Sequence, residues 1–178
     1  MNWTYSFAMS LDGYIADSEG GVDWLQGYED ALAGFDDFLS RMQVLLMGRK
    51  TYEQVLGFGE WPYGTKPTLV IGSEFQHPPR PHVSYLPAST ENIRQQATAF
   101  GAMEGWIVGG TKTAELMLNA GIMTTLEVFL IPRILGGGTP AFTGLFSKAK
   151  LELKSEGRFD SGVVRLEYRV GGGETYVD

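Results

Sequence analysis

The stretch "LLMGRKTYEQV" (residues 45–55) begins as a buried strand and turns into a helix through a glycine, two cations and a threonine. Free amides at a helix N-terminus, together with the helix dipole, favour an anion. Gly48, Arg49, Lys50 and Thr51 therefore form a candidate anion site at the end of a strand. A solvated start to an ordinary helix explains the same residues equally well, so a second stretch has to decide.

That second stretch is "GWIVGGTKTAELML" (residues 105–118), in which a buried strand again leads through glycines into a helix. Paired glycines let a ligand approach the backbone closely, although tight packing of strand against helix also explains them. The candidate residues here are Gly109, Gly110, Thr111, Lys112 and Thr113. Two anion sites at the carboxyl ends of strands in one open sheet suit a dinucleotide. We therefore expect Thr51 and Thr111 to meet on the same side of the sheet, joined by a groove.

The rest of the chain predicts a three-layer α/β fold. Short apolar runs, each bounded by glycine, proline or polar residues, predict strands over residues 3–9, 44–47, 68–71, 106–108 and 126–131. Several of these runs are apolar on both faces, as in a mostly parallel sheet covered on both sides by helices. After these strands, residues 149–170 alternate polar and apolar around "DSG" and predict an antiparallel hairpin at the sheet edge. The tail, residues 171–178, is expected to fray.

Helical spacing is found in three segments between the strands, over residues 29–42, 89–101 and 111–121. The first segment has an apolar stripe that we expect to pack on the sheet, made of Leu32, Phe35, Leu39 and Met42. The stripe of the second segment is made of Ile93, Ala97 and Phe100. The expected caps and exits are Ser89 or Thr90 with Gly101, and Thr111 with Gly121.

Composition limits the classes of function. The chain has 178 residues, 43% of them apolar, which predicts one folded domain over residues 1–178. A net charge of -7 argues against a nucleic acid or an anionic membrane surface as partner. With no cysteine and two histidines, we expect neither disulfides nor a metal site. No segment has the pattern of a signal peptide or a spanning helix, so the expected location is cytoplasmic.

Five motifs together carry a family resemblance. In chain order they are "SLDGYIA" (10–16), "MGRKTYE" (47–53), "LVIGS" (69–73), "IVGGTKTAELML" (107–118) and "LGGGTPAF" (135–142). This set resembles the dihydrofolate reductase fold, and most closely small bacterial relatives of the reductase domain of the bifunctional riboflavin-biosynthesis deaminase-reductase. The resemblance implies hydride transfer from NADPH to a small heterocyclic substrate, and a homodimer. Two alternatives stay open: a nucleotide-binding protein of the same fold without catalysis, and a phosphate-handling enzyme such as a kinase.

Carried over by position, the resemblance also implies roles for single residues. Ala8 and Ile15 would flank the nicotinamide, and Ser73 would approach the adenosine 2′-phosphate. Residues 48–51 would hold phosphates, and residues 109–113 would wrap the diphosphate. The loop of residues 12–25 would cover the nicotinamide.

The substrate side is defined less sharply by the resemblance. The carboxylate that assists protonation in dihydrofolate reductases has Glu29 or Asp30 as its counterpart, with Asp23 as a third candidate. Acidic residues placed at a helix start for its dipole would look the same. Trp61 and Tyr63 are candidates for stacking on a flat ring, or else packing anchors. The aspartate-asparagine-proline turn of the riboflavin enzyme is absent after "MGRKTYE", which argues against its ribosylaminopyrimidine substrate.

Overall fold

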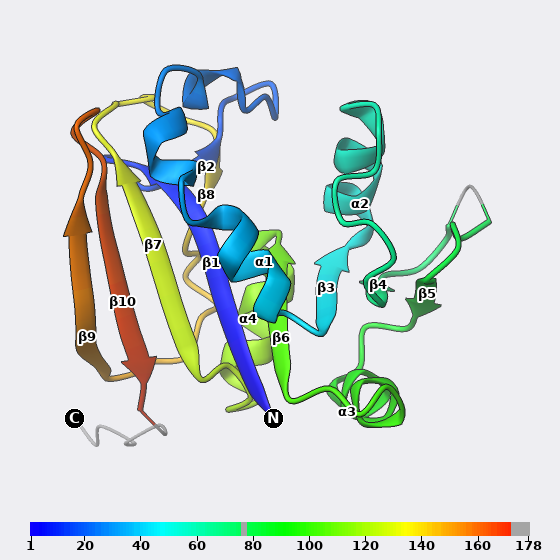
Figure 1. Cartoon of the computed structure of the whole chain (residues 1–178). Coiled ribbons are helices and arrows are strands. Elements are labelled where there is room, and N and C mark those ends of the chain that lie inside the picture. Colours follow the sequence, from blue (N-terminus) through cyan, green and yellow to red (C-terminus); the bar gives the residue numbers. More distant parts are fainter. Residues whose placement is uncertain (76–77, 172–178) are drawn as a thin grey trace.

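The main sheet has eight strands in the order β5-β4-β3-β6-β1-β7-β10-β9. The computed structural model describes residues 1–75 and 78–171, so the predicted frayed tail lies, apart from Gly171, outside the described residues. Each neighbouring pair from β5 to β7 is parallel, and β10 runs antiparallel to both β7 and β9. The predicted mostly parallel sheet with a C-terminal antiparallel hairpin is therefore confirmed (Figure 1). The strands are β1 (Asn2–Ser10), β3 (Val44–Gly48), β4 (Thr68–Ile71), β5 (Val83–Leu86), β6 (Glu104–Gly109), β7 (Thr125–Ile131), β9 (Leu151–Arg158) and β10 (Val164–Val170).

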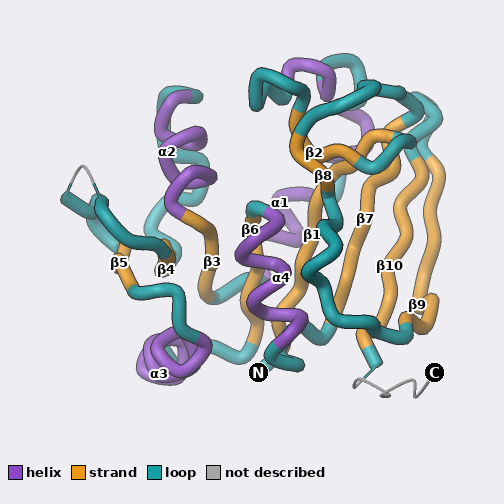
Figure 2. Tube along the Cα trace, turned by 180° about the vertical axis from the view of Figure 1, so that it is seen from behind, coloured by secondary structure: helices purple, strands orange, loops and turns teal. Residues whose placement is uncertain are grey.

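Helices cover both faces of this sheet. On one face, α1 (Phe35–Arg41) and α2 (Arg49–Gly57) pack against Leu45 and Met47. On the other face, α3 (Thr90–Ala99) and α4 (Thr111–Asn119) pack against Val44 and Leu46. Figures 1 and 2 view the molecule from these two sides. The alternation along β3 explains why its residues are apolar without interruption, since side chains of successive residues enter different cores.

The segment predicted as one helix over residues 29–42 is two shorter elements. A 3-10 helix, η2 (Glu29–Leu32), precedes α1, and Ala33 and Gly34 separate them. Glycine is unfavourable inside a helix by about 1 kcal/mol, and here Gly34 stands at the N-cap of α1 instead. As a result, Leu32 does not join the stripe on the sheet but is 61% exposed.

Two further details of the helix predictions need correction. Thr111 does not cap α4: Gly110 is the N-cap, and Thr111 is the first helical residue. Phe100, predicted on the buried stripe of α3, is exposed at its C-cap. The predicted helix exits are confirmed, since Gly101 and Gly121 have φ values of +66° and +64°.

A clamp joins the loop after β1 to the loop before β8. The strands β2 (Tyr14–Ala16) and β8 (Thr139–Pro140) form a small separate sheet. Beside it, the Asp12 carboxylate accepts hydrogen bonds from the Ser10 hydroxyl (2.7 Å) and from the amides of Leu135 (3.1 Å) and Gly136 (2.7 Å). Slight burial opposes the charge, but these three bonds lower the pKa of Asp12 overall. The clamp holds both loops next to the carboxyl end of β1.

Replacing Asp12 with asparagine is expected to lower the melting temperature at pH 7, because the amide cannot accept all three bonds with the strength of a carboxylate. Because the pKa of Asp12 is lower in the folded state, its carboxylate stabilises the fold at pH values above its ordinary pKa of about 4. This stabilisation is lost as the pH falls through the folded-state pKa. The difference in melting temperature between the wild type and Asp12→Asn should therefore become smaller in acid. Thermal unfolding at several pH values measures it, with Glu60→Gln in an exposed loop as the charge-matched control. An equal shift in both variants would contradict the clamp.

Candidate functional site

The sheet opens between β1 and β6 at the carboxyl ends of the strands. β1 pairs with β6 only over its first half: the pairing begins at Asn2 and Glu104 and ends at Tyr5 and Ile107. Beyond Tyr5, β1 continues to Ser10 in register with β7. The two strands thus part at the edge where open α/β sheets bind their ligands.

The two predicted anion sites lie side by side at this edge. Met47 at the end of β3 is paired with Gly109 at the end of β6. A Cβ placed on Gly48 would stand 3.0 Å from the Thr113 hydroxyl, and one on Gly110 would stand 3.5 Å from the Thr51 hydroxyl. Although α2 and α4 cover opposite faces of the sheet, their first turns therefore meet. Their free amides and dipoles point at one shared region.

The two cations of the first anion site differ in their surroundings. Arg49 donates from one nitrogen to both oxygens of Glu53, at 2.7 and 3.0 Å. Lys50 is exposed beside it. Gly72, just before the exposed Ser73, has its Cβ position 3.2 Å from that of Arg49, so the end of β4 adjoins the start of α2.

The second anion site is held by its backbone and one hydroxyl. The peptide bond between Gly109 and Gly110 is cis, and Gly109 has a φ of +137°, which side-chain-bearing residues rarely adopt. The buried Thr111 donates its hydroxyl to the carbonyl of Pro140 (2.7 Å), which ties α4 to the clamped loop. Lys112 is exposed and Thr113 is buried.

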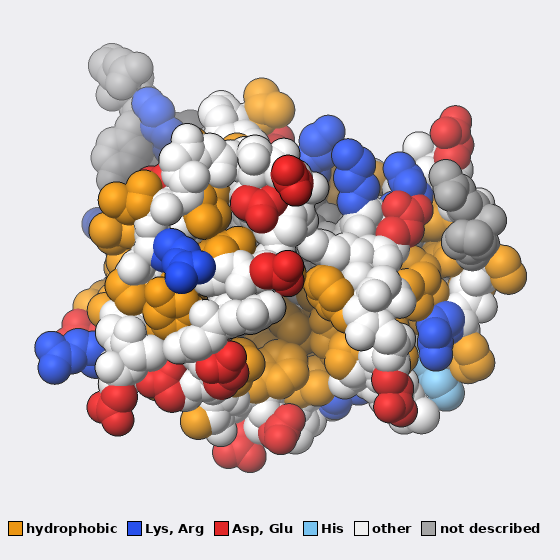
Figure 3. All heavy atoms as spheres, turned by 90° about the horizontal axis from the view of Figure 1, so that it is seen from above, with side chains coloured by type: hydrophobic (Ala, Val, Ile, Leu, Met, Phe, Trp, Pro, Cys, Tyr) orange, Lys and Arg blue, Asp and Glu red, His pale blue; other side chains and the backbone are white. Residues whose placement is uncertain are grey.

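A cavity of about 430 Å³ opens beside the split in the sheet, on the face that α1 covers. Ala8, predicted to flank the nicotinamide, lines it, and so does Leu32. Figure 3, which looks down on the carboxyl ends of the strands, shows a hollow with hydrophobic side chains inside it. The aromatic part of the lining is Phe7, Tyr28, Phe35, Phe38, Trp106, Phe129 and Phe159. This volume suits a small organic ligand, since such sites hold roughly 300 to 1,000 Å³.

Polar side chains form a connected network at one wall of this cavity. Glu127 accepts hydrogen bonds from the Ser6 hydroxyl (2.5 Å) and from Arg165 Nε (2.6 Å). Arg165 also donates to Glu167 (2.6 Å) and to Ser155 (3.0 Å). Burial opposes the charge of Arg165, but the two carboxylates raise its pKa overall. Sequence reasoning missed this network, although the apolar neighbours of Glu127 in "LEVFLI" were a usable signal of its burial.

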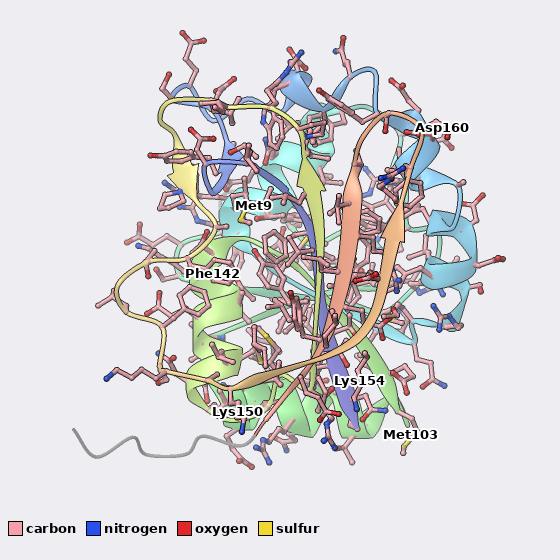
Figure 4. The ribbon with its side chains drawn as sticks, turned by 90° about the vertical axis from the view of Figure 1, so that its left-hand side faces the viewer. Met9, Met103, Phe142, Lys150, Lys154 and Asp160 are labelled. Carbon is pink, nitrogen blue, oxygen red and sulfur yellow. The ribbon has the colours of Figure 1, made fainter. Side chains whose placement is uncertain are left out.

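Glu29 and Asp30 are absent from the described residues that line the cavity. Glu29 accepts the amide of Gly27 (2.9 Å), and Asp30 accepts the amide of Ser161 (2.9 Å). That amide belongs to the turn between β9 and β10, which Asp160 marks in Figure 4. The Gly27 amide lowers the pKa of Glu29, and the side chain and amide of Ser161 lower the pKa of Asp30, whereas a general acid near neutral pH needs a raised pKa. Their catalytic role stays a prediction, and the geometry favours another carboxylate.

The two aromatic candidates from the loop before β4 are also absent from the described lining. Tyr63 is buried and meets Trp106 and Trp61 edge to face, with ring centroids 5.7 and 5.0 Å apart. Burial raises the pKa of Tyr63 to about 12. Their contacts are those of packing anchors that support Trp106, which itself lines the cavity.

The chain was compared with protein families, with other protein sequences and with solved structures. No protein-family model matches the chain. The uncharacterized protein YwjB of Bacillus subtilis (strain 168) is 29% identical over 163 residues, which are 90% of this chain and 93% of YwjB. A protein from Shewanella sp. PV-4, proposed to act in riboflavin biosynthesis, has a structure with a TM-score of 0.86 at 28% identity, covering 97% of this chain and 100% of that one.

Two enzymes of known activity share the fold at lower identity. The Thermotoga maritima diaminohydroxyphosphoribosylaminopyrimidine deaminase/5-amino-6-(5-phosphoribosylamino)uracil reductase gives a TM-score of 0.73 at 19% identity, over 96% of this chain and 56% of the enzyme. Dihydrofolate reductase from Enterococcus faecalis, in complex with NADP(H) and RAB-propyl, gives a TM-score of 0.69 at 19% identity, over 96% of this chain and 97% of the enzyme. The chain therefore has the dihydrofolate reductase-like fold. The predicted resemblance to these reductases is confirmed.

Proposed function

We propose that the protein is an NADPH-dependent reductase that transfers a hydride to a small heterocyclic substrate. The observation that carries the proposal is the meeting of two helix N-termini at the carboxyl end of the sheet, where β1 and β6 part. The cavity lies at the same split, although its described lining includes none of residues 48–51 and 109–113. One anion site alone would suit any phosphate. Two sites in contact suit an extended dinucleotide, and a cavity with aromatic walls at the same end of the sheet suits a flat acceptor.

The residues fit the cofactor because the space between the two helix starts depends on glycines. A side chain on Gly48 or Gly110 would enter this space, where the Thr51 and Thr113 hydroxyls also lie. First-turn amides of α2 and α4 would hold the diphosphate, with Lys50 and Lys112 adding charge. Arg49 and Ser73 would hold the 2′-phosphate, and Ala8 and Ile15 would orient the nicotinamide. The cofactor, when bound, supplies the hydride.

This chain then has to position the acceptor and exclude water. The aromatic walls can hold a flat ring beside Ala8, so that donor and acceptor meet in a fixed orientation. Asp12, through its clamp on the loop before β8, keeps the region around β2 and Ile15 in place. Hydride transfer also needs one proton, from water or a carboxylate.

Replacing both Arg49 and Lys50 with alanine tests the cofactor assignment. NADPH affinity should fall roughly 100-fold or more, because each of the two lost charge-assisted hydrogen bonds contributes about 1.5 to 3 kcal/mol. NADH, which lacks the 2′-phosphate, should lose clearly less. Binding is measured by nicotinamide fluorescence enhancement, with Arg94→Ala on α3 as the control cation. Equal losses for both cofactors would show that these residues do not distinguish the 2′-phosphate.

The absence of Glu29 and Asp30 from the described cavity lining favours a second candidate, a nucleotide-binding protein of the same fold without catalysis. Steady oxidation of NADPH in the presence of dihydrofolate or a riboflavin precursor would exclude it. Tight NADPH binding without turnover on either substrate would support it. The cytoplasmic location, the homodimer and a place in riboflavin biosynthesis stay predictions.

A further inference from the structure

The polar network that reaches the cavity wall at Ser6, Glu127 and Arg165 is built on a row of residues that crosses four strands. Register places Ser6 of β1 opposite Glu127 of β7, Glu127 opposite Glu167 of β10, and Glu167 opposite Ser155 of β9. Directly opposite residues lie on the same face of a sheet. Two carboxylates therefore stand side by side on the face that carries the cavity. Arg165, which lies opposite Phe129 in the next row, joins them.

Glu127 and Arg165 both line the cavity, and both have hydrogen-bonding capacity left over. A carboxylate offers about four lone-pair positions, of which Ser6 and Arg165 use two. A guanidinium has five N–H groups, and the bonds to Glu127, Ser155 and Glu167 use three. An acceptor and donors thus lie together in a wall that is otherwise mainly aromatic and aliphatic.

The charge of this group limits what it can bind. Glu127, Glu167 and Arg165 together carry one net negative charge, so this group by itself does not attract a phosphate or carboxylate. The other charged residue in the described lining of the cavity is Arg41. A purely apolar ligand would remove water from Glu127 and Arg165 without replacing its hydrogen bonds, which is unfavourable. The matching ligand has an N–H next to a C=O, and the aromatic walls require it to be flat.

We propose that Glu127 and Arg165 bind the lactam edge of a flat heterocycle in this cavity. The ligand N–H donates to Glu127, and the neighbouring carbonyl accepts from Arg165. Glu127 on β7, rather than Glu29 or Asp30, is then the carboxylate that faces the ring. That this ring is the hydride acceptor rests on the proposed function, whereas the recognition itself needs no cofactor.

The test compares two ligands. Lumazine is a flat bicyclic ring with N–H groups beside carbonyls, and 1,3-dimethyllumazine carries methyl groups in place of both N–H hydrogens. Titration of the full chain, without NADPH, follows quenching of tryptophan fluorescence, since Trp106 lines the cavity. The wild type should bind lumazine at least tenfold more tightly than the dimethyl compound. Glu127→Gln should lose this preference, while Glu156→Gln, at an exposed position on the adjacent hairpin strand, should keep it.

Two outcomes overturn the inference: lumazine fails to bind the wild type, or Glu127→Gln keeps the preference. In the second case methyl bulk alone would explain the discrimination. If Glu127→Gln does not fold, Arg165→Lys keeps the positive charge but removes the guanidinium N–H groups. It should then weaken lumazine binding at least threefold, because the ligand carbonyl loses its donors, and an unchanged affinity would overturn the inference. NADPH titrated in parallel separates the two proposals. Lumazine binding as expected, without any NADPH binding, would sink the proposed function and leave this inference standing.

Discussion

Replacing Arg165 with methionine is expected to lower the free energy of unfolding by about 2 to 4 kcal/mol at pH 7. Methionine keeps most of the side-chain length but leaves Glu127 and Glu167 directly opposite each other without a cation. Breaking a buried pair costs about 3 to 5 kcal/mol. The Glu167 side chain is 34% exposed, so solvent screening makes the expected loss smaller than that range.

Thermal and denaturant unfolding measure this effect. For a chain of this size, the melting temperature should fall by roughly 5 to 15 °C, because each kcal/mol shifts it by about 2 to 4 °C. In the double variant Arg165→Met/Glu127→Gln, one carboxylate is neutral, so part of the stability should return at pH 7.

Arg169 on the same strand is the matched control. It pairs with Glu152 at the surface, and its side chain is 64% exposed. Exposed ion pairs contribute about 0 to 1 kcal/mol, so Arg169→Met should have a small effect. If the two methionine variants are equally stable, the network at the cavity wall does not behave as a buried charge cluster.

The central strands and helix starts could be predicted because local chemistry decides them. Runs such as "VLLM" (44–47) and "TLVI" (68–71) have no polar position to place at a surface, and the structure buries β4 completely. The glycine, two cations and threonine of residues 48–51 predicted the start of α2 in the same way. The meeting of α2 and α4 followed from a general rule, that carboxyl ends of parallel strands share one edge.

In the segment of residues 29–42, the break at Gly34 could be read from the sequence, but the long-range contact that holds its first turn could not. Its apolar spacing fits a helix, yet Asp30 binds the amide of Ser161, 131 residues away in the chain. Periodicity carries no information about such a bond. The 3-10 helix leaves Leu32 at the cavity instead of on the sheet.

The hydrogen-bond network around Glu127 could not be predicted for a related reason. Its partners Ser6 and Arg165 lie 121 and 38 residues away, and only the strand register brings them together. Alternation in "LEVFLI" places Glu127 on one face with Phe129 and Ile131, but it does not say which strands stand on either side. A buried carboxylate therefore pointed to a partner without identifying it.

Replacing Gly110 with alanine is expected to weaken NADPH binding at least 100-fold while the melting temperature changes little. The backbone of Gly110, with φ -81° and ψ -162°, is extended and open to other residues. Its added Cβ would meet only the Thr51 hydroxyl, at 3.5 Å, which is ordinary van der Waals contact, so the fold can accept it. The same methyl group would stand between the first turns of α2 and α4, where the diphosphate has to approach the amides. A loss of 100-fold corresponds to about 2.7 kcal/mol, within reach of two or three displaced hydrogen bonds.

Two other glycines on these elements make the experiment selective. Gly57→Ala, at the far end of α2, adds a Cβ with no neighbour within 4 Å, so it should leave NADPH affinity unchanged and should not lower the melting temperature. Gly48→Ala brings its Cβ to 3.0 Å from the Thr113 hydroxyl, so it should lower the melting temperature as well as the affinity, and Thr113→Ala in the same chain should restore stability. NADPH titration and thermal unfolding without ligand, run on all variants, separate these effects. Wild-type affinity in Gly110→Ala would mean that no diphosphate lies between the two helix starts, and the reductase proposal would lose its main support.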